Sequence, residues 1–245
     1  TPLWVQVPPL APFVIKMFFK TTFLFILLGM YASAQSLEDK IENFILENPE
    51  IILESLKNYE IEKENEQKSL NQLKVKKYFK QLTDISSGLF KGNLKSDKVI
   101  VKFFDYNCSY CRKANADLDE IVKEHKDLKV IYKNFPILSE NSVYLAKLGI
   151  LAAEKNNQTF QKFYGLINDK KGLINQGELK KILKDIQIDP EQLNNAEISK
   201  RVESKLSKDV ELAKKLGLRG TPAFVIGDNI IFGYLKKDEL LDLLN

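Results

Sequence analysis

Residues 98–111 read KVIVKFFDYNCSYC and contain both cysteines of the chain, Cys108 and Cys111. Between residues 99 and 104 the sequence is apolar except for Lys102, a pattern typical of a strand that is buried on both faces of a sheet. The apolar run leads almost directly into the first cysteine. This stretch therefore predicts a buried strand with a closely spaced pair of thiols at its carboxyl end.

The sequence after the cysteines predicts a helix and then a second strand. Leu118, Ile121 and Val122 have the spacing of an amphipathic helix. Residues 129–135 are rich in β-branched and aromatic side chains, as a second strand requires. Strand, helix and strand in this order predict a parallel βαβ unit.

A long helical region is expected from about residue 139 to residue 216. Its polar residues include several that favour helix N-termini, and Asp189-Pro190 marks the start of a further helix. The expected caps of its first three helices are Ser139 or Asn141, then Thr159, then Asn175 in a capping box with Glu178.

Strand signals return near the C-terminus. Residues 223–226 and 230–232 are apolar, and Gly-Asp at 227–228 predicts a tight hairpin turn between them. A leucine-rich closing helix follows. The whole pattern predicts an α/β thioredoxin-like fold over residues 85–245, with the helical region inserted in the middle of its sheet.

The N-terminus is expected to act in export rather than in the fold. A basic region precedes the apolar run 23–31, and residues 32–34 (Ala-Ser-Ala) resemble a cleavage site. We therefore expect translation from Met17, a signal peptide at 17–34 and a periplasmic mature protein. Residues 1–16 would then be upstream sequence. The alternative is an uncleaved N-terminal anchor.

Between the signal peptide and the main domain, residues 35–84 predict a helical arm. Asn48-Pro49 indicates the start of a second helix within it. The expected apolar stripe consists of Leu37, Ile41, Phe44, Ile45, Ile52, Leu56, Tyr59, Leu70, Leu73 and Phe79. Because such an arm cannot bury its stripe alone, we expect it to mediate oligomerisation. A helix packed on the main domain is the alternative.

The two cysteines have the spacing that thiol–disulfide exchange requires. This chemistry needs a thiolate nucleophile and a second thiol within reach. The N-terminus of a helix favours a thiolate at Cys108, and Cys111, one turn further, can resolve the mixed disulfide. Phe104, Tyr106 and Tyr110 are expected to form an apolar rim suited to unfolded polypeptide.

Composition argues against other classes of function. The net charge is +4 and both signs are interleaved, so no nucleic-acid surface is indicated. The cysteine pair supplies two of the four ligands that a zinc site needs, and no phosphate-binding glycine loop is present. We therefore expect neither a bound metal nor a cofactor.

A second motif lies far from the cysteines in the sequence. Thr221-Pro222 opens the later apolar strand, and a cis bond before proline is rare enough to be a specific feature. With the upstream cysteine pair, it resembles the cis-proline loop of thioredoxin-fold enzymes. Such a loop would place the backbone of Thr221 beside Cys108, where an extended substrate could pair with it.

Residues 98–111 and 219–224 (RGTPAF) together resemble the DsbA-like family of exported thioredoxin-fold thiol–disulfide oxidoreductases. The resemblance implies that Cys108 is the nucleophile and Cys111 the resolving cysteine. It further implies that Thr221 and Pro222 contact substrate and that no cofactor is required. The N-terminal arm is similar to the oligomerisation segment of the ScsC-like and Com1-like subgroup, which implies a homotrimer.

Two positions depart from the family pattern. Ser109-Tyr110 stands where the best-known members have a dipeptide with histidine, so we expect a less acidic Cys108 and a less oxidising disulfide. Lys102 stands where many relatives have a buried acid. Its charge could stabilise the thiolate, or the side chain could extend outward to solvent. Asp105 is the nearest substitute for the acid.

The resemblance implies that unfolded or misfolded exported proteins are the substrates. We expect an isomerase or reductase, served by a membrane redox partner of the DsbB or DsbD type. A disulfide-donating oxidase is the alternative. A chaperone, or a protein that binds copper(I) through its two thiols, is the alternative from another class.

Overall fold

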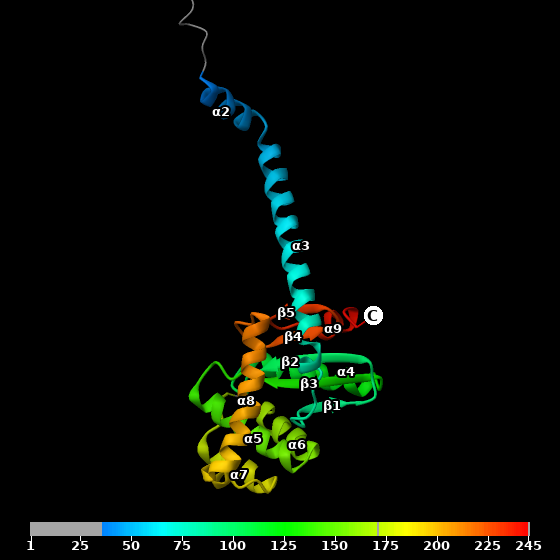
Figure 1. Ribbon diagram of the computed structural model, residues 1–245, viewed down its shortest axis with the longest axis vertical. Coiled ribbons are helices and arrows are strands. Elements are labelled where there is room, and N and C mark those ends of the chain that lie inside the picture. Colours follow the sequence, from blue (N-terminus) through cyan, green and yellow to red (C-terminus); the bar gives the residue numbers. More distant parts are fainter. Residues whose placement is uncertain (1–35, 171, 245) are drawn as a thin grey trace, which may run out of the picture. The chain divides into compact units, whose positions relative to one another are not determined.

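The computed structural model describes residues 36–170 and 172–244 (Figure 1). The chain divides into two compact units, one that ends at Lys63 and one that starts at Glu64. The expected upstream segment and signal peptide lie outside the described residues. Within the described ranges, no helix is both long and apolar enough to cross a membrane.

The first unit contains helix α2 (Leu37–Glu47) and the first part of helix α3 (Pro49–Leu82). Ser36 caps α2 in a capping box with Asp39, and Pro49 begins α3, as the Asn-Pro pair predicts. The large apolar side chains of this unit are exposed: Leu37, Ile41, Phe44, Ile45, Leu46, Ile51, Ile52, Leu53, Leu56, Tyr59 and Ile61.

In the described part of the second unit, the strands form one five-stranded sheet of order β1-β3-β2-β4-β5. The strands are β1 (Phe90–Gly92), β2 (Lys98–Phe104), β3 (Leu128–Asn134), β4 (Ala223–Ile226) and β5 (Asn229–Phe232). Strands β2 and β3 are parallel and the other pairs are antiparallel. The predicted βαβ unit and C-terminal hairpin are confirmed, and β1 is an edge strand that the sequence analysis missed.

The helices of this unit follow the expected order. They are α4 (Ser109–Glu124), α5 (Glu140–Lys155), α6 (Asn157–Asn168), α7 (Gln176–Asp185), the 3-10 helix η1 (Pro190–Asn194), α8 (Ala196–Leu216) and α9 (Lys237–Asp242). Ser139 caps α5, and Asn175 caps α7 with Glu178. The prediction for α6 was wrong, because Asn156 is the cap and its side chain accepts the backbone N–H of Thr159.

The sheet has a hydrophobic core on each face, because successive side chains of a strand point to opposite sides. Ile100 and Phe104 belong to the core that α4, α5 and α6 cover. Val101 and Phe103 belong to the core that the C-terminal part of α3 and α8 cover. Strand β2 is therefore buried on both faces, as its apolar sequence predicts.

The C-terminal part of α3 differs from the expected amphipathic pattern. Its buried residues are Asn71, Val75 and Leu82, which lie on one helical face at spacings of four and seven. The residues expected to form the stripe are exposed: Leu70, Leu73 and Phe79. Because Val75 and Leu82 belong to the second core, the compact unit starts at Glu64 rather than at residue 85.

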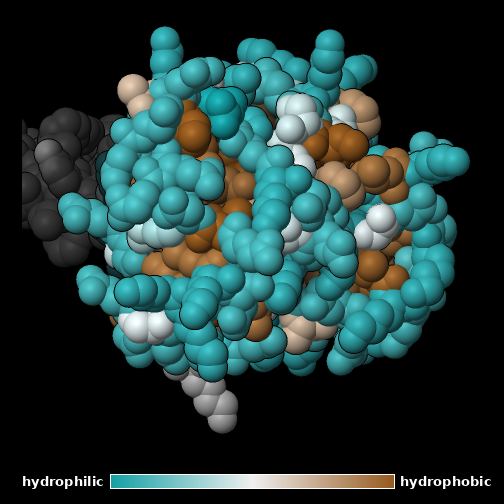
Figure 2. Space-filling model, turned by 90° about the horizontal axis from the view of Figure 1, so that it is seen from below, coloured by the Kyte–Doolittle hydropathy of each residue, from teal (hydrophilic) through white to brown (hydrophobic). Residues whose placement is uncertain are grey.

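Figure 2 views the molecule from the end at which α7 lies in Figure 1. Hydrophilic residues cover most of this face, and apolar residues show between them. This is the pattern of helices whose inner sides form a core and whose outer sides face water.

Candidate functional site

The cysteine pair lies where β2 ends and α4 begins. Cys108 is the N-cap of α4, and its Sγ atom accepts the backbone N–H of Cys111 at 3.2 Å. Serine, threonine, aspartate or asparagine usually fills this position, because one of the first helical N–H groups needs an acceptor. Here the acceptor is sulfur, so the amide and the helix dipole act directly on the thiol.

Asp105 fixes the loop between the strand and the cysteines. Its buried carboxylate accepts the backbone N–H groups of Asn107 at 2.8 Å, Ile137 at 2.9 Å and Leu138 at 3.0 Å. It therefore joins the loop after β2 to the loop after β3. Because its acceptor positions face these amides, Asp105 holds the two loops together.

The second sequence motif lies directly beside the first. The Thr221–Pro222 peptide is cis, and the Cys108 thiol donates a hydrogen bond to the Thr221 carbonyl oxygen at 3.2 Å. The pairing of β2 with β4 brings the two motifs together, since Phe103 is the register partner of Ala223. The candidate residues Cys108, Cys111, Thr221 and Pro222 therefore form one site.

The pKa values of the two thiols are shifted in opposite directions. The pKa of Cys108 is lowered to about 6, and the largest cause is a hydrogen bond with the Cys111 side chain. Hydrogen bonds from the Thr221 side chain and from the backbone amides of Cys111 and Tyr110 act in the same direction. Burial acts in the opposite direction. Burial, and then the neighbouring Cys108, raises the pKa of Cys111 far above its usual value. Near neutral pH, Cys108 is therefore a thiolate and Cys111 a thiol.

The expected apolar rim is only partly present. Phe104 and Tyr106 are buried in an aromatic cluster with ring centroids 4.9 Å apart, so neither faces a substrate. Tyr110 is 62% exposed. The sequence analysis missed two exposed apolar residues, Ile137 and Leu138, whose amides bind Asp105 close to the cysteines. Their sequence signal is weak, because they belong to an irregular loop.

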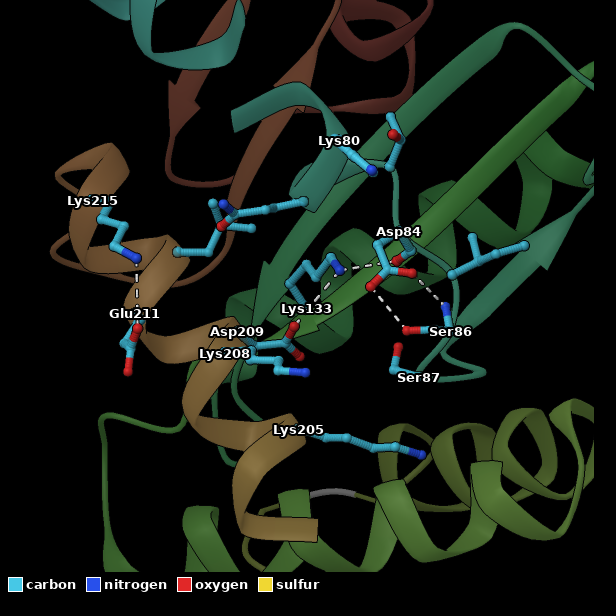
Figure 3. Close-up of a pocket in the computed structure, with 14 residues that line it drawn as sticks. Lys80, Asp84, Ser86, Ser87, Lys133, Lys205, Lys208, Asp209, Glu211 and Lys215 are labelled. Carbon is cyan, nitrogen blue, oxygen red and sulfur yellow. Dashed lines mark hydrogen bonds and ion pairs between the residues drawn. The ribbon is translucent and has the colours of Figure 1, made fainter. Parts of the chain in front are cut away.

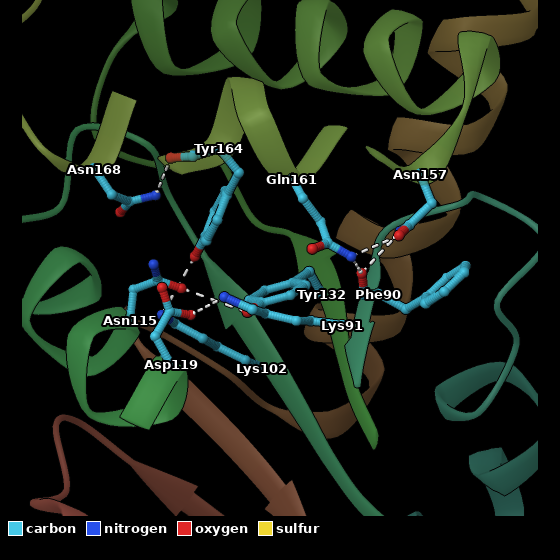
Figure 4. A network of polar contacts seen from close by, with 10 residues as sticks. All are labelled: Phe90, Lys91, Lys102, Asn115, Asp119, Tyr132, Asn157, Gln161, Tyr164 and Asn168. Carbon is cyan, nitrogen blue, oxygen red and sulfur yellow. Dashed lines mark hydrogen bonds and ion pairs between the residues drawn. The ribbon is translucent and has the colours of Figure 1, made fainter. Parts of the chain in front are cut away.

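Lys102 is fully buried and points into the core on the side of α4 and α6 (Figure 4). Its Nζ atom donates to the carbonyl oxygen of Cys111 at 2.8 Å and to the hydroxyl of Tyr164 at 3.3 Å. It also lies 6.0 Å from the ring centroid of Tyr132. The alternative in which this lysine extends to solvent is therefore wrong.

A polar network surrounds this lysine (Figure 4). Asp119 of α4 forms an ion pair with Lys91 of β1, with an N–O distance of 2.5 Å. The hydroxyl of Tyr132 donates to Asn115 at 3.4 Å. Asp119, the carboxylate of this network, is thus already paired with a cation other than Lys102.

A separate cavity of about 850 Å³ lies between the end of α3, the loop after it and α8 (Figure 3). Five lysines line it: Lys80, Lys133, Lys205, Lys208 and Lys215. Three of them are paired with acids, namely Lys133 with Asp209, Lys205 with Glu154 and Lys215 with Glu211. No residue of the cysteine site lines this cavity. Most of the lysines that line it are balanced by paired carboxylates.

Comparison with known proteins gives consistent matches. Residues 99–245 match the family described as DSBA-like thioredoxin domain. A probable disulfide bond formation protein D from Bacillus cereus is 29% identical over 152 residues, which cover 56% of this chain and 70% of that protein.

Two solved structures share the fold. The thiol-disulfide exchange protein alpha-DsbA2 from Wolbachia pipientis is 24% identical, with a TM-score of 0.66 over 72% of this chain and 95% of its own. A deletion and substitution variant of ScsC from Proteus mirabilis is 23% identical, with a TM-score of 0.65. That match covers 87% of this chain and 93% of the ScsC chain.

Proposed function

This chain belongs to the family of DSBA-like thioredoxin domains, and from this premise we propose that Cys108 and Cys111 are its redox pair. One observation carries the proposal. The Cys108 sulfur lies between the Cys111 amide and the Thr221 carbonyl oxygen, at 3.2 Å from each, with its pKa lowered to about 6. Such a thiol is a nucleophile near neutral pH.

The proposed chemistry proceeds through a mixed disulfide. The Cys108 thiolate attacks one sulfur of a substrate disulfide, and the other substrate sulfur leaves as a thiolate. Cys111 then attacks the Cys108 sulfur and releases the reduced substrate, which leaves a Cys108–Cys111 disulfide. In isomerisation, a second substrate thiol attacks the mixed disulfide instead, and the enzyme is released in its reduced form.

Thr221, Pro222 and Tyr110 are the proposed substrate contacts. The Thr221 carbonyl faces Cys108 across 3.2 Å, so an extended substrate segment beside this loop would have its cysteine next to the nucleophile. Tyr110 is exposed directly before Cys111 and offers an aromatic surface to unfolded chains.

We further propose that the protein is an exported, periplasmic isomerase or reductase whose N-terminal helices assemble copies into a homotrimer. The support is the large number of exposed apolar side chains on α2 and the first part of α3, because large exposed apolar surfaces mark interaction sites. A membrane redox partner of the DsbB or DsbD type would recycle the cysteine pair. A disulfide-donating oxidase is the alternative.

Refolding of a substrate with scrambled disulfides tests the proposal. The full mature chain should restore native disulfides, and a Cys108→Ala variant should not. A variant that starts at Glu64 keeps the buried Val75 and Leu82, so it tests the part of the arm that belongs to the first unit. Loss of isomerase activity in this variant supports an oligomeric isomerase. Oxidation of reduced substrate alone, with no effect of the arm, supports the oxidase.

The same variants test the other class of function. Suppression of aggregation by Cys108→Ala, equal to that of the unaltered protein and without any exchange activity in either, would indicate a chaperone. Copper(I) bound by the unaltered protein, with no exchange activity, would indicate a copper-binding protein.

A further inference from the structure

We propose that Lys102 is a positioning residue that controls the resolving thiol: Lys102 and Cys111 share one proton, and the ammonium–thiolate form closes the disulfide. This inference rests on the proposed function of the cysteine pair. It concerns the second step of exchange, in which Cys111 attacks Cys108.

The first argument is the geometry of Lys102. Its side chain has no exposure to solvent, and its Nζ atom is 2.8 Å from the carbonyl oxygen of Cys111. Its other hydrogen-bond acceptor is the neutral hydroxyl of Tyr164. Within residues 36–170 and 172–244, no carboxylate lies at ion-pair distance from this ammonium group. A buried charge without a counter-ion is costly, so the group favours an anion nearby.

The second argument is the state of the acidic groups around it. On α4, Asp119 is paired with Lys91, and Asp117 accepts the hydroxyl of Tyr234 at 2.7 Å. Both carboxylates therefore already bind other groups. They act on Lys102 only at longer range, and weakly compared with burial.

The remaining titratable groups that face Lys102 are two tyrosines and the two cysteines. Burial raises the pKa of Tyr132 on β3 and of Tyr164 on α6 well above the usual value, so both remain neutral. Once Cys108 is bound to substrate it carries no charge. Cys111 is then the neighbouring group left that can become an anion.

The third argument is that the two members of the pair stabilise each other's charged form. Burial lowers the pKa of Lys102 to about 8, and the negative charge of Cys111 opposes this effect most strongly. Burial raises the pKa of Cys111, and the charge of Lys102 opposes that effect. Neutral Lys102 with a Cys111 thiol and charged Lys102 with a Cys111 thiolate hold the same number of protons. The two groups therefore titrate as a unit.

The proposed step balances as follows. In the mixed disulfide, the pair loses one proton to solvent, the remaining proton stays on Lys102, and the Cys111 thiolate attacks the Cys108 sulfur. The Cys108–Cys111 bond forms, the bond from Cys108 to the substrate breaks, and the substrate sulfur leaves with the electron pair and takes a proton from water. Lys102 keeps its proton during this step. In the reverse reaction, Cys111 leaves as a thiolate beside the Lys102 ammonium and then takes a proton from solvent.

Rapid mixing of the reduced full-length protein with oxidised glutathione separates the two steps. The attack by Cys108 is second order, and closure by Cys111 is first order. In the unaltered protein, the closure rate should rise with pH and level off above about pH 8, where the pair has lost one proton. In Lys102→Met it should be about tenfold slower at pH 7, the effect of one pKa unit, and should keep rising with pH.

Lys133→Met is the matched control, since Lys133 is also a buried lysine of the sheet but is paired with Asp209. It should keep the levelling near pH 8. Lys102→Gln provides a second neutral variant, so that the result does not depend on the folding of Lys102→Met. An unchanged closure rate and pH profile in the neutral variants would overturn the inference while leaving the proposed function standing. Absence of any exchange in the unaltered protein would overturn both.

Discussion

Lys102 and Lys133 are buried lysines on the two parallel strands at the centre of the sheet, yet their surroundings differ. The strand register pairs Lys102 with Tyr132 and Phe103 with Lys133, so the two lysines point to opposite faces. Lys133 lies 3.7 Å from the Asp209 carboxylate and donates to the Asp84 carbonyl oxygen at 3.0 Å. Lys102 has neutral acceptors and a buried thiol beside it.

This difference separates a structural charge from a functional one. The Lys133 charge is balanced by Asp209, which in turn accepts the backbone N–H of Asn134 at 2.9 Å and so ties α8 to β3. The Lys102 charge is not balanced by any acid of the described chain at ion-pair distance. A buried charge that the fold does not neutralise can stabilise the opposite charge when a neighbouring group ionises during the reaction.

The largest effect expected from this comparison is on stability. Lys133→Met leaves the buried Asp209 carboxylate without its cation and should lower the free energy of unfolding by about 3 kcal/mol. Lys102→Met removes an unpaired buried charge and should leave the stability unchanged or increase it. Urea unfolding at pH 7 measures both changes. Equal destabilisation by the two substitutions would show that the two lysines have the same structural role.

The pH dependence of stability should also differ between the two faces. Burial raises the pKa of Asp209 to about 6, so the folded state binds more protons than the unfolded state between about pH 4 and 6. The contribution of this group to stability therefore falls as pH rises through that window. Asp209→Asn should remove this fall, as measured by thermal unfolding from pH 4 to 7. A fall of the same size in the variant would contradict the assignment.

Lys102 should act in the opposite direction at alkaline pH. Burial lowers its pKa from 10.5 to about 8, so the unfolded state binds more protons between these values. Its contribution to stability is lost as pH falls through 8 and is fully present above 10.5. Lys102→Met should therefore be less stabilised than the unaltered protein when the pH is raised from 8 to 10. Parallel stability curves would contradict the burial of an unpaired amine.

The smallest expected effect is on the nucleophile itself. The charges of Lys102 and Cys108 also act on each other, but less strongly than those of Lys102 and Cys111. Lys102→Met should raise the pKa of Cys108 by less than about one unit, and Lys133→Met should not change it. The pH dependence of Cys108 alkylation measures this shift. An equal shift in both variants would show that the effect is not local to Lys102.

The sequence predicts the parts of the site that depend on local pattern. The apolar run before Cys108 predicts a buried strand, and Thr221-Pro222 before a second apolar run predicts the facing loop. Pairing of their strands then brings the two motifs together. The same approach missed β1, because its three residues are too few to show a strand pattern.

The remaining errors concern which way a side chain points. Tyr106 is close to the cysteines in sequence, but it faces the aromatic cluster rather than substrate. Asn156 and Thr159 can both cap a helix, and only the backbone of the structure distinguishes them. The direction of Lys102 depends on packing by Tyr132 and Tyr164, which are remote in sequence.

Alkylation of the reduced protein across the pH range, followed by peptide mapping, tests the central claim that Cys108 is the activated nucleophile and Cys111 the shielded partner. Modification of Cys108 should follow a titration with a midpoint near pH 6, and Cys111 should remain unmodified at neutral pH. Modification of Cys111 at the same rate would contradict the account. A Cys108 midpoint near the ordinary thiol value of about 8.5 would contradict it equally.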